Sequence, residues 1–299
     1  MTAEKATLLR VRALAKINLS LRMVGTAPDG YHAVRTVLQS IAVHDTLTFR
    51  ERRGPFTLEC DEAACPVDAR NLVWRAAEAI ARAAGGAGAP RDIAIRLTKR
   101  IPMQAGLGGG SSDAAATLRG FAALWGVQIP RERLHALAAS LGADVPFFLD
   151  GGTALGVERG DQLFGLIDAP PAWVTLVLPA FGVSTKDAYR WWDELAESGR
   201  TGGSREGAGP VGRTLSDEGI NDLQAAVVHR HPEIGRIVSA LRRHGASQAA
   251  MSGSGSAVFG LFPTRTAADR AARAVAARGR RILVTRTVNR VDYQRLAAC

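Results

Sequence analysis

A segment of small residues offers the clearest chemistry in this sequence. It runs from Pro102 to Ser112, reads PMQAGLGGGSS and places four glycines within five residues. Such a backbone carries few Cβ atoms, and Ser111 and Ser112 are candidates for the N-cap of a following helix. Free N–H groups at a helix start, the helix dipole and successive loop amides together form an anion site. The segment predicts a phosphate-binding loop or a flexible connection that ends in a capped helix, and composition alone favours neither.

The spacing of this segment differs from that of the familiar phosphate loops. A Walker loop needs a lysine after its last glycine, and a dinucleotide fingerprint needs a third glycine where Ser111 lies. The HRD and DFG signatures of protein kinases do not occur. Asp113, in the first turn of the expected helix, suits the helix dipole but would repel a phosphate unless a cation lay between them. Mg²⁺ is therefore consistent with this site, although its ligands are unknown at this stage.

Two charged residues are candidates for moving a proton and stabilising charge. Asp144 follows an expected helix in the sequence GADVP, although on spacing alone an Asp that bonds to local backbone is the better interpretation. Lys16 lies on the polar face of an expected strand, and Asn18 follows on the same face. A strand lysine usually faces solvent, but this chain has only four lysines among its 38 basic residues. A compact ammonium near Asp144 would keep the carboxylate ionised and polarise a hydroxyl.

Strands and helices must position these groups, and the hydrophobic pattern predicts their order. The expected strands are 8–24, 34–50 (two strands, broken near residues 44–45), 56–60, 92–98, 173–178, 248–262 (two strands around a turn) and 281–288. The expected helices are 71–84, 112–125, 131–141, 185–197, 222–230, 233–244 and 265–278. Because strands and helices do not alternate regularly, we expect an α+β protein with two lobes, residues 1–160 and 161–299. The Gly-, Ser- and Arg-rich stretch 198–216 predicts a mobile surface loop.

Composition narrows the classes of partner. The chain has 299 residues, 46% of them hydrophobic, and a formal net charge of +10. The charge makes a nucleic-acid-binding protein an alternative, but the arginines are spread along the chain without a long basic run. No stretch approaches the roughly 20 apolar residues of a membrane span, and no secretory signal is apparent. We therefore expect a cytoplasmic protein that binds neither nucleic acid nor membranes.

Three further blocks give the sequence a family resemblance. The segment 102–113 resembles the ATP-binding motif of the GHMP kinases, which include galactokinase, homoserine kinase and mevalonate kinase. Residues 15–32 (AKINLSLRMVGTAPDGYH), 141–148 (LGADVPFF) and 251–259 (MSGSGSAVF) resemble the members of that family that phosphorylate a diphosphocytidyl-methylerythritol. The resemblance covers nearly the whole chain, with Leu14 in place of the usual proline and extra loop at 198–216. It implies a two-lobed fold with an N-terminal nucleotide-binding lobe and a C-terminal α/β-sandwich lobe.

The resemblance also implies an activity and a set of site residues. ATP would phosphorylate a tertiary hydroxyl of the cytidylyl substrate, with Mg²⁺, in a monomer or weak homodimer; a homoserine or mevalonate kinase is the nearest alternative. Asp144 would act as the base, Lys16 would stabilise charge, and the turn 251–256 would help to hold the diphosphate part. The nucleotide-binding residues would be Pro102, Met103, Gln104, Ala105, Gly106, Leu107, Gly108, Gly109, Gly110, Ser111 and Ser112. The substrate-binding residues would be Asn18, Tyr31, His32 and Tyr189.

Overall fold

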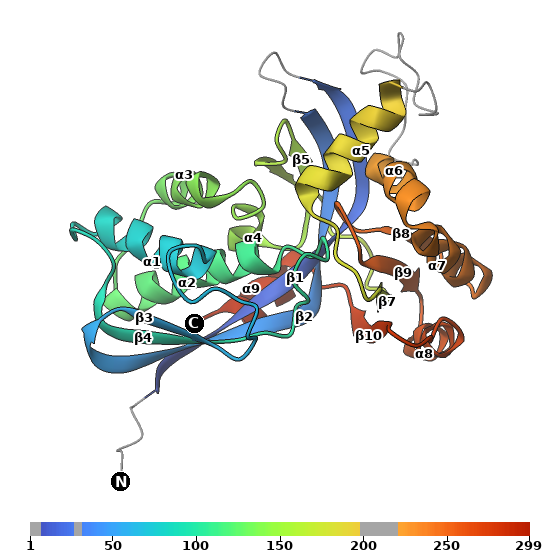
Figure 1. Cartoon of the computed structure of the whole chain (residues 1–299). Helices are drawn as coiled ribbons and strands as arrows, with labels where there is room; N and C mark the ends of the chain where they lie inside the picture. The colour runs from blue at the N-terminus through green and yellow to red at the C-terminus, as the bar shows by residue number, and fades with distance from the viewer. Residues whose placement is uncertain (1–6, 27–31, 198–220) are drawn as a thin grey trace.

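The computed structural model describes residues 7–26, 32–197 and 221–299, so the predicted loop 198–216 and Tyr31 lie outside the described residues. Two sheets with helices packed on them form two lobes (Figure 1). The strands are β1 (Thr7–Thr26), β2 (His32–Pro55), β3 (Thr57–Cys60), β4 (Arg91–Thr98), β5 (Thr153–Val157), β6 (Gln162–Gly165), β7 (Trp173–Leu178), β8 (Gln248–Met251), β9 (Val258–Phe262) and β10 (Arg281–Arg286). The helices are α1 (Leu72–Ala83), α2 (Gly109–Trp125), α3 (Arg131–Leu141), α4 (Phe147–Asp150), α5 (Thr185–Glu197), α6 (Asp222–Arg230), α7 (Pro232–Arg243), α8 (Arg265–Ala274) and α9 (Arg290–Ala297). The predicted α+β class is confirmed.

The first sheet is built on one long antiparallel pair. β1 and β2 pair over nearly their whole lengths, and the sheet order is β3-β4-β2-β5-β6, with β1 paired to β2. The predicted break near residues 44–45 is wrong, because β2 runs continuously from His32 to Pro55. A register shift between Leu14 and Ala15 leaves extra residues in β2 at this point, which makes it a bulge within one strand.

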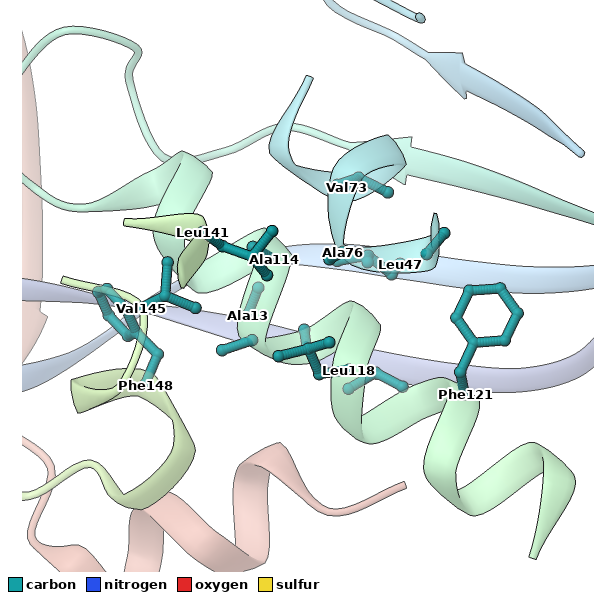
Figure 2. Packing of buried hydrophobic residues seen from close by; sticks show 14 of the residues in the cluster. Ala13, Leu47, Val73, Ala76, Ala114, Leu118, Phe121, Leu141, Val145 and Phe148 are labelled. Atoms are coloured by element: carbon teal, nitrogen blue, oxygen red, sulfur yellow. The ribbon is translucent and has the colours of Figure 1, made fainter. Parts of the chain in front are cut away.

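Helices α1 and α2 cover this sheet and form its core. Small residues of α2 let the helix lie close to β1, and a Cβ on Gly120 would overlap with the ring of Phe49. Leu118 and Phe121 of α2 are fully buried, so the helix turns an apolar stripe towards the core. Figure 2 shows side chains of both helices packed beside those of the two long strands. The residues labelled there include Ala13, Leu47, Val73, Ala76, Ala114, Leu118 and Phe121. The phosphate-loop segment thus leads into a helix that is firmly packed.

The second sheet has the order β10-β7-β9-β8, with every neighbouring pair antiparallel. Helices α6, α7 and α8 lie beside this sheet (Figure 1). Apolar side chains of the sheet and of these helices form a second core. The predicted elements of this lobe are confirmed, with α8 and β10 ending a few residues early. Helix α5 lies beside the far end of the β1–β2 pair (Figure 1), where it becomes part of the site.

The C-terminal helix α9 was not expected from the pattern. It packs against β1 and α4, and the Tyr293 hydroxyl donates a hydrogen bond of 2.7 Å to the carbonyl oxygen of Phe148. Gly151 permits this contact, because a Cβ there would overlap with the Tyr293 ring. The chain therefore ends on its first lobe. Because β6 pairs with β5 as far as Gly165, the first sheet extends past residue 160. The division of the chain into lobes 1–160 and 161–299 stays a prediction.

Candidate active site

The phosphate-loop segment joins β4 to α2 and ends at the helix start. The N-cap of α2 is Gly108, whose φ of +70° is left-handed, and no side chain caps the first N–H groups. The expectation that Ser111 or Ser112 caps the helix is therefore wrong, since both lie within its first turn. The Ser112 hydroxyl instead donates a hydrogen bond of 2.6 Å to the carbonyl oxygen of Leu14. A helix start without a side-chain cap is suited to an anion.

The loop is held between β1 and the second glycine-rich turn, residues 252–255. The backbone N–H of Lys16 donates to the carbonyl oxygen of Leu107 at 3.1 Å. On the other side, the Ser252 hydroxyl donates to the carbonyl oxygen of Gly106 at 2.9 Å. The two glycine-rich segments thus form one surface, although 146 residues separate them in the sequence.

Asn221 fixes the second turn in place, and sequence reasoning did not single it out. Its side-chain amide donates to the carbonyl oxygens of Met251 at 2.8 Å and Gly253 at 2.7 Å. Its Oδ1 accepts from the backbone N–H of Leu223, so Asn221 is also the N-cap of α6. The only sequence signal was an Asn before a helix, which does not indicate the long-range contacts.

Replacing Gly106 with alanine is expected to weaken ATP binding by at least tenfold. Gly106 has a φ of +74°, and its Cβ would overlap with the backbone carbonyl of Ser252, which cannot yield without moving the turn. Calorimetric measurement of the Kd for ATP tests this. Gly88→Ala is the matched control, because nothing lies within 4 Å of its added Cβ and its φ is not left-handed. Equal ATP affinity in both variants would show that the loop tolerates displacement.

Lys16 and Asp144 meet in the cleft beside the loop. Lys16 Nζ lies 3.5 Å from Asp144 Oδ2, with the lysine side chain 5% exposed and the aspartate 38% exposed. Nζ also donates to Asn18 Oδ1 at 2.6 Å, and Asn18 Nδ2 donates to Thr36 Oγ1 at 2.7 Å. The expected polar face of β1 is therefore turned into the protein and not to solvent. The buried ammonium thus lies beside a half-open carboxylate at the wall of the cleft.

A second buried lysine lies under the start of α2, and sequence reasoning missed it. Lys99 Nζ lies 2.5 Å from Asp45 Oδ2 and 2.7 Å from Asp113 Oδ2, with all three side chains almost fully buried. Burial favours the neutral amine, but the two carboxylates more than offset it, so the pKa of Lys99 is raised. Burial, reinforced by Asp45 and opposed by Lys99, raises the pKa of Asp113 to about 8. Asp113 therefore pairs with Lys99, and the sequence-based idea of a cation between Asp113 and a phosphate is not needed.

Asp113→Asn is expected to change how stability depends on pH. Because the pKa of Asp113 is higher in the folded state than its ordinary value, the folded state binds this proton more tightly than the unfolded state. The resulting stabilisation is complete below about pH 4 and is lost as pH rises towards 8. Asparagine does not titrate, so the variant does not lose this stabilisation as pH rises. The free energy of unfolding of the variant minus that of the parent protein should therefore be larger at about pH 8.5 than at pH 5.

Urea denaturation at these two pH values measures the effect. Asp269→Asn, at a partly exposed aspartate on α8, is the control and should show no such difference. If the free-energy gap between parent and Asp113→Asn were the same at both pH values, the pKa of Asp113 would not be raised in the folded state.

Two of the predicted substrate-binding residues, His32 and Tyr189, lie where α5 meets the β1–β2 pair. Tyr189 lines the cleft, and its ring centroid lies 5.3 Å from that of His32. The His32 ring also meets Trp192 edge to face at 5.4 Å, and its Nε2 lies 2.6 Å from Asp193 Oδ1. The two described aromatic candidates are thus neighbours. The sequence did not predict that Trp192 and Asp193 contact His32, because the periodicity of a helix does not indicate which other element packs against that helix.

One cleft connects the phosphate loop, the Lys16–Asp144 pair and Tyr189, whereas His32 is not part of its lining. The cleft has a volume of about 700 Å³ and is lined by the phosphate loop, Lys16, Asn18, Asp144, Tyr189 and the turn residues Gly253 and Ser254. In the parts of the chain that the structure describes, no helix is long and apolar enough to cross a membrane. Over the same ranges, no three His, Cys, Asp or Glu side chains form a metal cluster.

Comparison with known proteins agrees with this geometry. The model of the GHMP kinases N terminal domain matches residues 71–152, and that of the GHMP kinases C terminal matches residues 204–281. The fold also matches a homoserine kinase from Cytophaga hutchinsonii, with a TM-score of 0.65 and 20% identity over 97% of this chain and 96% of that one. The fold and the cleft therefore define a GHMP kinase, an ATP-dependent small-molecule kinase.

More similar relatives identify the family within this class. A 4-diphosphocytidyl-2-C-methyl-D-erythritol kinase from Pelotomaculum thermopropionicum is 44% identical over 93% of this chain and 97% of its own. The enzyme of the same name from Moorella thermoacetica is 41% identical over 94% and 99%. A crystal structure of 4-(cytidine 5'-diphospho)-2C-methyl-D-erythritol kinase has a TM-score of 0.75 and 34% identity, covering 93% of this chain and 99% of that one. The chain belongs to the family of 4-diphosphocytidyl-2-C-methyl-D-erythritol kinases, which confirms the resemblance found in the sequence.

Proposed function

We propose that this protein transfers the γ-phosphoryl group of ATP to the 2-hydroxyl of 4-diphosphocytidyl-2-C-methyl-D-erythritol, giving the 2-phosphate and ADP in isoprenoid precursor synthesis. Family membership carries the choice of substrate. The observation that carries the chemistry is the Lys16–Asp144 pair at 3.5 Å in the same cleft as the glycine-rich loop. Phosphoryl transfer needs such positioning and charge neutralisation more than covalent chemistry.

Asp144 is the group that accepts the proton of the attacking hydroxyl. It is half-open to the cleft, whereas Lys16 is buried, so the substrate oxygen approaches the carboxylate first. Lys16 stabilises the negative charge that develops on the oxygens during transfer. The uncapped N–H groups at the start of α2 hold the phosphates of ATP. The proton leaves the hydroxyl for Asp144 as the oxygen–phosphorus bond forms.

The remaining residues position the two substrates. Asn18 lines the cleft beside Lys16, where its amide is already oriented by Thr36. Tyr189 and His32, with Tyr31 outside the described residues, bind the cytosine. Gly253 and Ser254 lie in the cleft next to the phosphate loop, where backbone N–H groups can receive the diphosphate of the acceptor. The substrate then spans the cleft from α5 to the Lys16–Asp144 pair.

Mg²⁺ accompanies ATP in this proposal. Asp113 is already paired with Lys99, so Asp144 is the carboxylate of the cleft that can approach the ion. A site with few protein ligands suits Mg²⁺, which usually keeps several waters and binds substrate phosphates. Bound there, it would neutralise phosphate charge. We also propose that the protein is cytoplasmic, that it is a monomer or a weak homodimer, and that it has no nucleic-acid partner.

A coupled assay of ADP release tests the substrate. The protein is supplied with ATP, Mg²⁺ and one acceptor at a time: the cytidylyl substrate, mevalonate or homoserine. We expect turnover with the cytidylyl substrate and none above background with the other two. Turnover of mevalonate or homoserine, without that of the cytidylyl compound, would assign a different activity within the GHMP kinases.

A further inference from the structure

The tip of the β5–β6 hairpin, residues 158–161, forms a fixed part of the cleft wall. The backbone N–H of Val34 donates a hydrogen bond of 2.7 Å to the carbonyl oxygen of Glu158, which fastens the tip to β2. Glu158 has a left-handed φ of +58°, a conformation that a residue with a side chain keeps only where its surroundings hold it. Arg159 follows this residue, is exposed and lines the cleft. Arg159 is therefore presented to the cleft by a backbone of defined position.

The attachment to β2 sets the place of the tip along the cleft. Val34 and Thr36 line the cleft from the same face of β2. Thr36 Oγ1 accepts a hydrogen bond from Asn18, which lies next to the reacting groups. In the other direction, His32 precedes Val34 by two residues and lies beside the ring of Tyr189. Because two residues of a strand span about 6–7 Å, the tip lies between the reacting groups and Tyr189.

The proposed acceptor carries its negative charge in this middle part. In a diphosphocytidyl-methylerythritol, the diphosphate joins the methylerythritol to the cytidine, and each phosphate group is ionised at neutral pH. The cleft offers the diphosphate uncharged donors where Ser254 Oγ lies 3.3 Å from Thr185 Oγ1. Hydrogen bonds from a charged donor are roughly twice as strong, and the planar guanidinium of an arginine can bind a phosphate through two parallel N–H groups. An arginine at the hairpin tip therefore complements the diphosphate.

The other cationic side chains that line the cleft, in the part of the chain that the structure describes, belong to different places. Lys16 lies at the Asp144 carboxylate, and Lys99 lies under the start of α2. Arg70 comes just before the start of α1. Among these cations, the register of β2 places Arg159 at the middle of the acceptor site.

We propose that Arg159 binds the diphosphate of the acceptor. Its guanidinium donates N–H groups to the phosphate oxygens and holds the acceptor at its middle, while Tyr189 contacts one end and the Lys16–Asp144 pair contacts the other. The contribution is to binding and not to proton transfer, and it selects an acceptor that carries a diphosphate over one that lacks it. The inference rests on the proposed function, because it requires the cytidylyl substrate to be the acceptor.

Binding of cytidine 5'-diphosphate and of cytidine, measured by NMR titration with a non-hydrolysable ATP analogue filling the nucleotide site, tests this contact. The parent protein should prefer the diphosphate by about tenfold or more. Arg159→Gln should weaken diphosphate binding by about tenfold or more, the effect of losing a charge-assisted hydrogen bond, and leave cytidine binding within about twofold. The same variant should raise the KM for the cytidylyl substrate by about tenfold, with kcat and the KM for ATP nearly unchanged.

Arg35→Gln is the matched control for this variant. Arg35 is exposed, follows Val34 on the opposite face of β2 and lies outside the described lining of the cleft. The control removes the same charge and should leave diphosphate binding unchanged. Arg159→Lys should recover only part of the affinity, because an ammonium lacks the planar fork of a guanidinium.

Equal binding of cytidine and its diphosphate by the parent protein, or unchanged diphosphate binding in Arg159→Gln, would overturn the proposal. An equal loss for cytidine would also overturn it, because the effect would then lie in the base or in the fold. A higher KM for ATP together with a lower kcat would mean that the arginine acts on the transferred phosphate, which contradicts the proposal as well. If the parent protein bound the diphosphate through Arg159 but failed to phosphorylate the cytidylyl substrate, the proposed function itself would fail, which is a distinguishable result.

Discussion

Asp144→Asn is expected to lower kcat by about 10²–10⁴-fold, the usual contribution of a positioned general base. The substitution keeps the shape of the side chain but removes the charge that accepts the hydroxyl proton. The Kd for ATP measured without Mg²⁺ should change little, because the phosphates are held by the loop and the start of α2. Lys16 Nζ keeps its 2.6 Å bond to Asn18 Oδ1 and is therefore not left without a partner.

Single-turnover kinetics together with calorimetric ATP binding test this expectation. Single-turnover rates report the chemical step even when product release limits kcat. Asp150→Asn is the control, since that aspartate pairs with Arg131 and lies outside the cleft lining. Near-normal turnover in Asp144→Asn would exclude Asp144 as the base. Loss of ATP binding would instead mean that the carboxylate acts on the bound nucleotide.

Local pattern was sufficient to predict part of the site. Alternation along β1 placed Lys16 and Asn18 on one face, and the structure joins their side chains by a hydrogen bond. For Asp144 the pattern was not sufficient: spacing alone favoured an aspartate that bonds to local backbone, and only the family resemblance assigned it to the site, where it lines the cleft. The prediction for Lys16 and Asn18 depends on neighbours within a few residues, where strand geometry leaves little freedom.

The contacts that the sequence did not reveal join distant segments. Lys99 follows β4 as one basic residue among many, and only the pairing of β4 with β2 brings it to Asp45. The start of α2 was placed too late because serine is a strong N-cap in general, whereas here Ser112 bonds across to β1. Asn221 and Asp193 likewise contact partners that lie 30 and 161 residues away. Periodicity carries no information on such pairings.

These long-range contacts explain why the loop can be glycine-rich and still have a defined shape. Glycine loses more conformational freedom on folding than any other residue, so four of them close together destabilise a loop that has no support. Here hydrogen bonds from β1 and from Ser252 fix the backbone at Leu107 and Gly106. The loop amides can therefore face a phosphate without being reordered when it binds, which is the advantage of a preorganised site.

Lys16→Met is expected to lower kcat by about 10²-fold or more, as loss of a charge-stabilising group does in other active sites. Methionine retains much of the apolar stem that packs beside Gly108, so the loop should keep its shape. Lys16→Arg should not restore activity. A Cβ on Gly108 would lie only 3.2 Å from Lys16 Cε, so the backbone leaves little room for a larger planar head.

The double variant Lys16→Met with Asp144→Asn provides the stricter test. If Lys16 and Asp144 act together on the same transition state, the two losses overlap, and the double variant should be scarcely slower than Asp144→Asn alone. Losses that multiply would mean that Lys16 acts on the phosphoryl group independently of Asp144. Thermal unfolding of all three variants supplies the control, since a turnover loss that followed a fall in Tm would reflect damage to β1 and not missing chemistry.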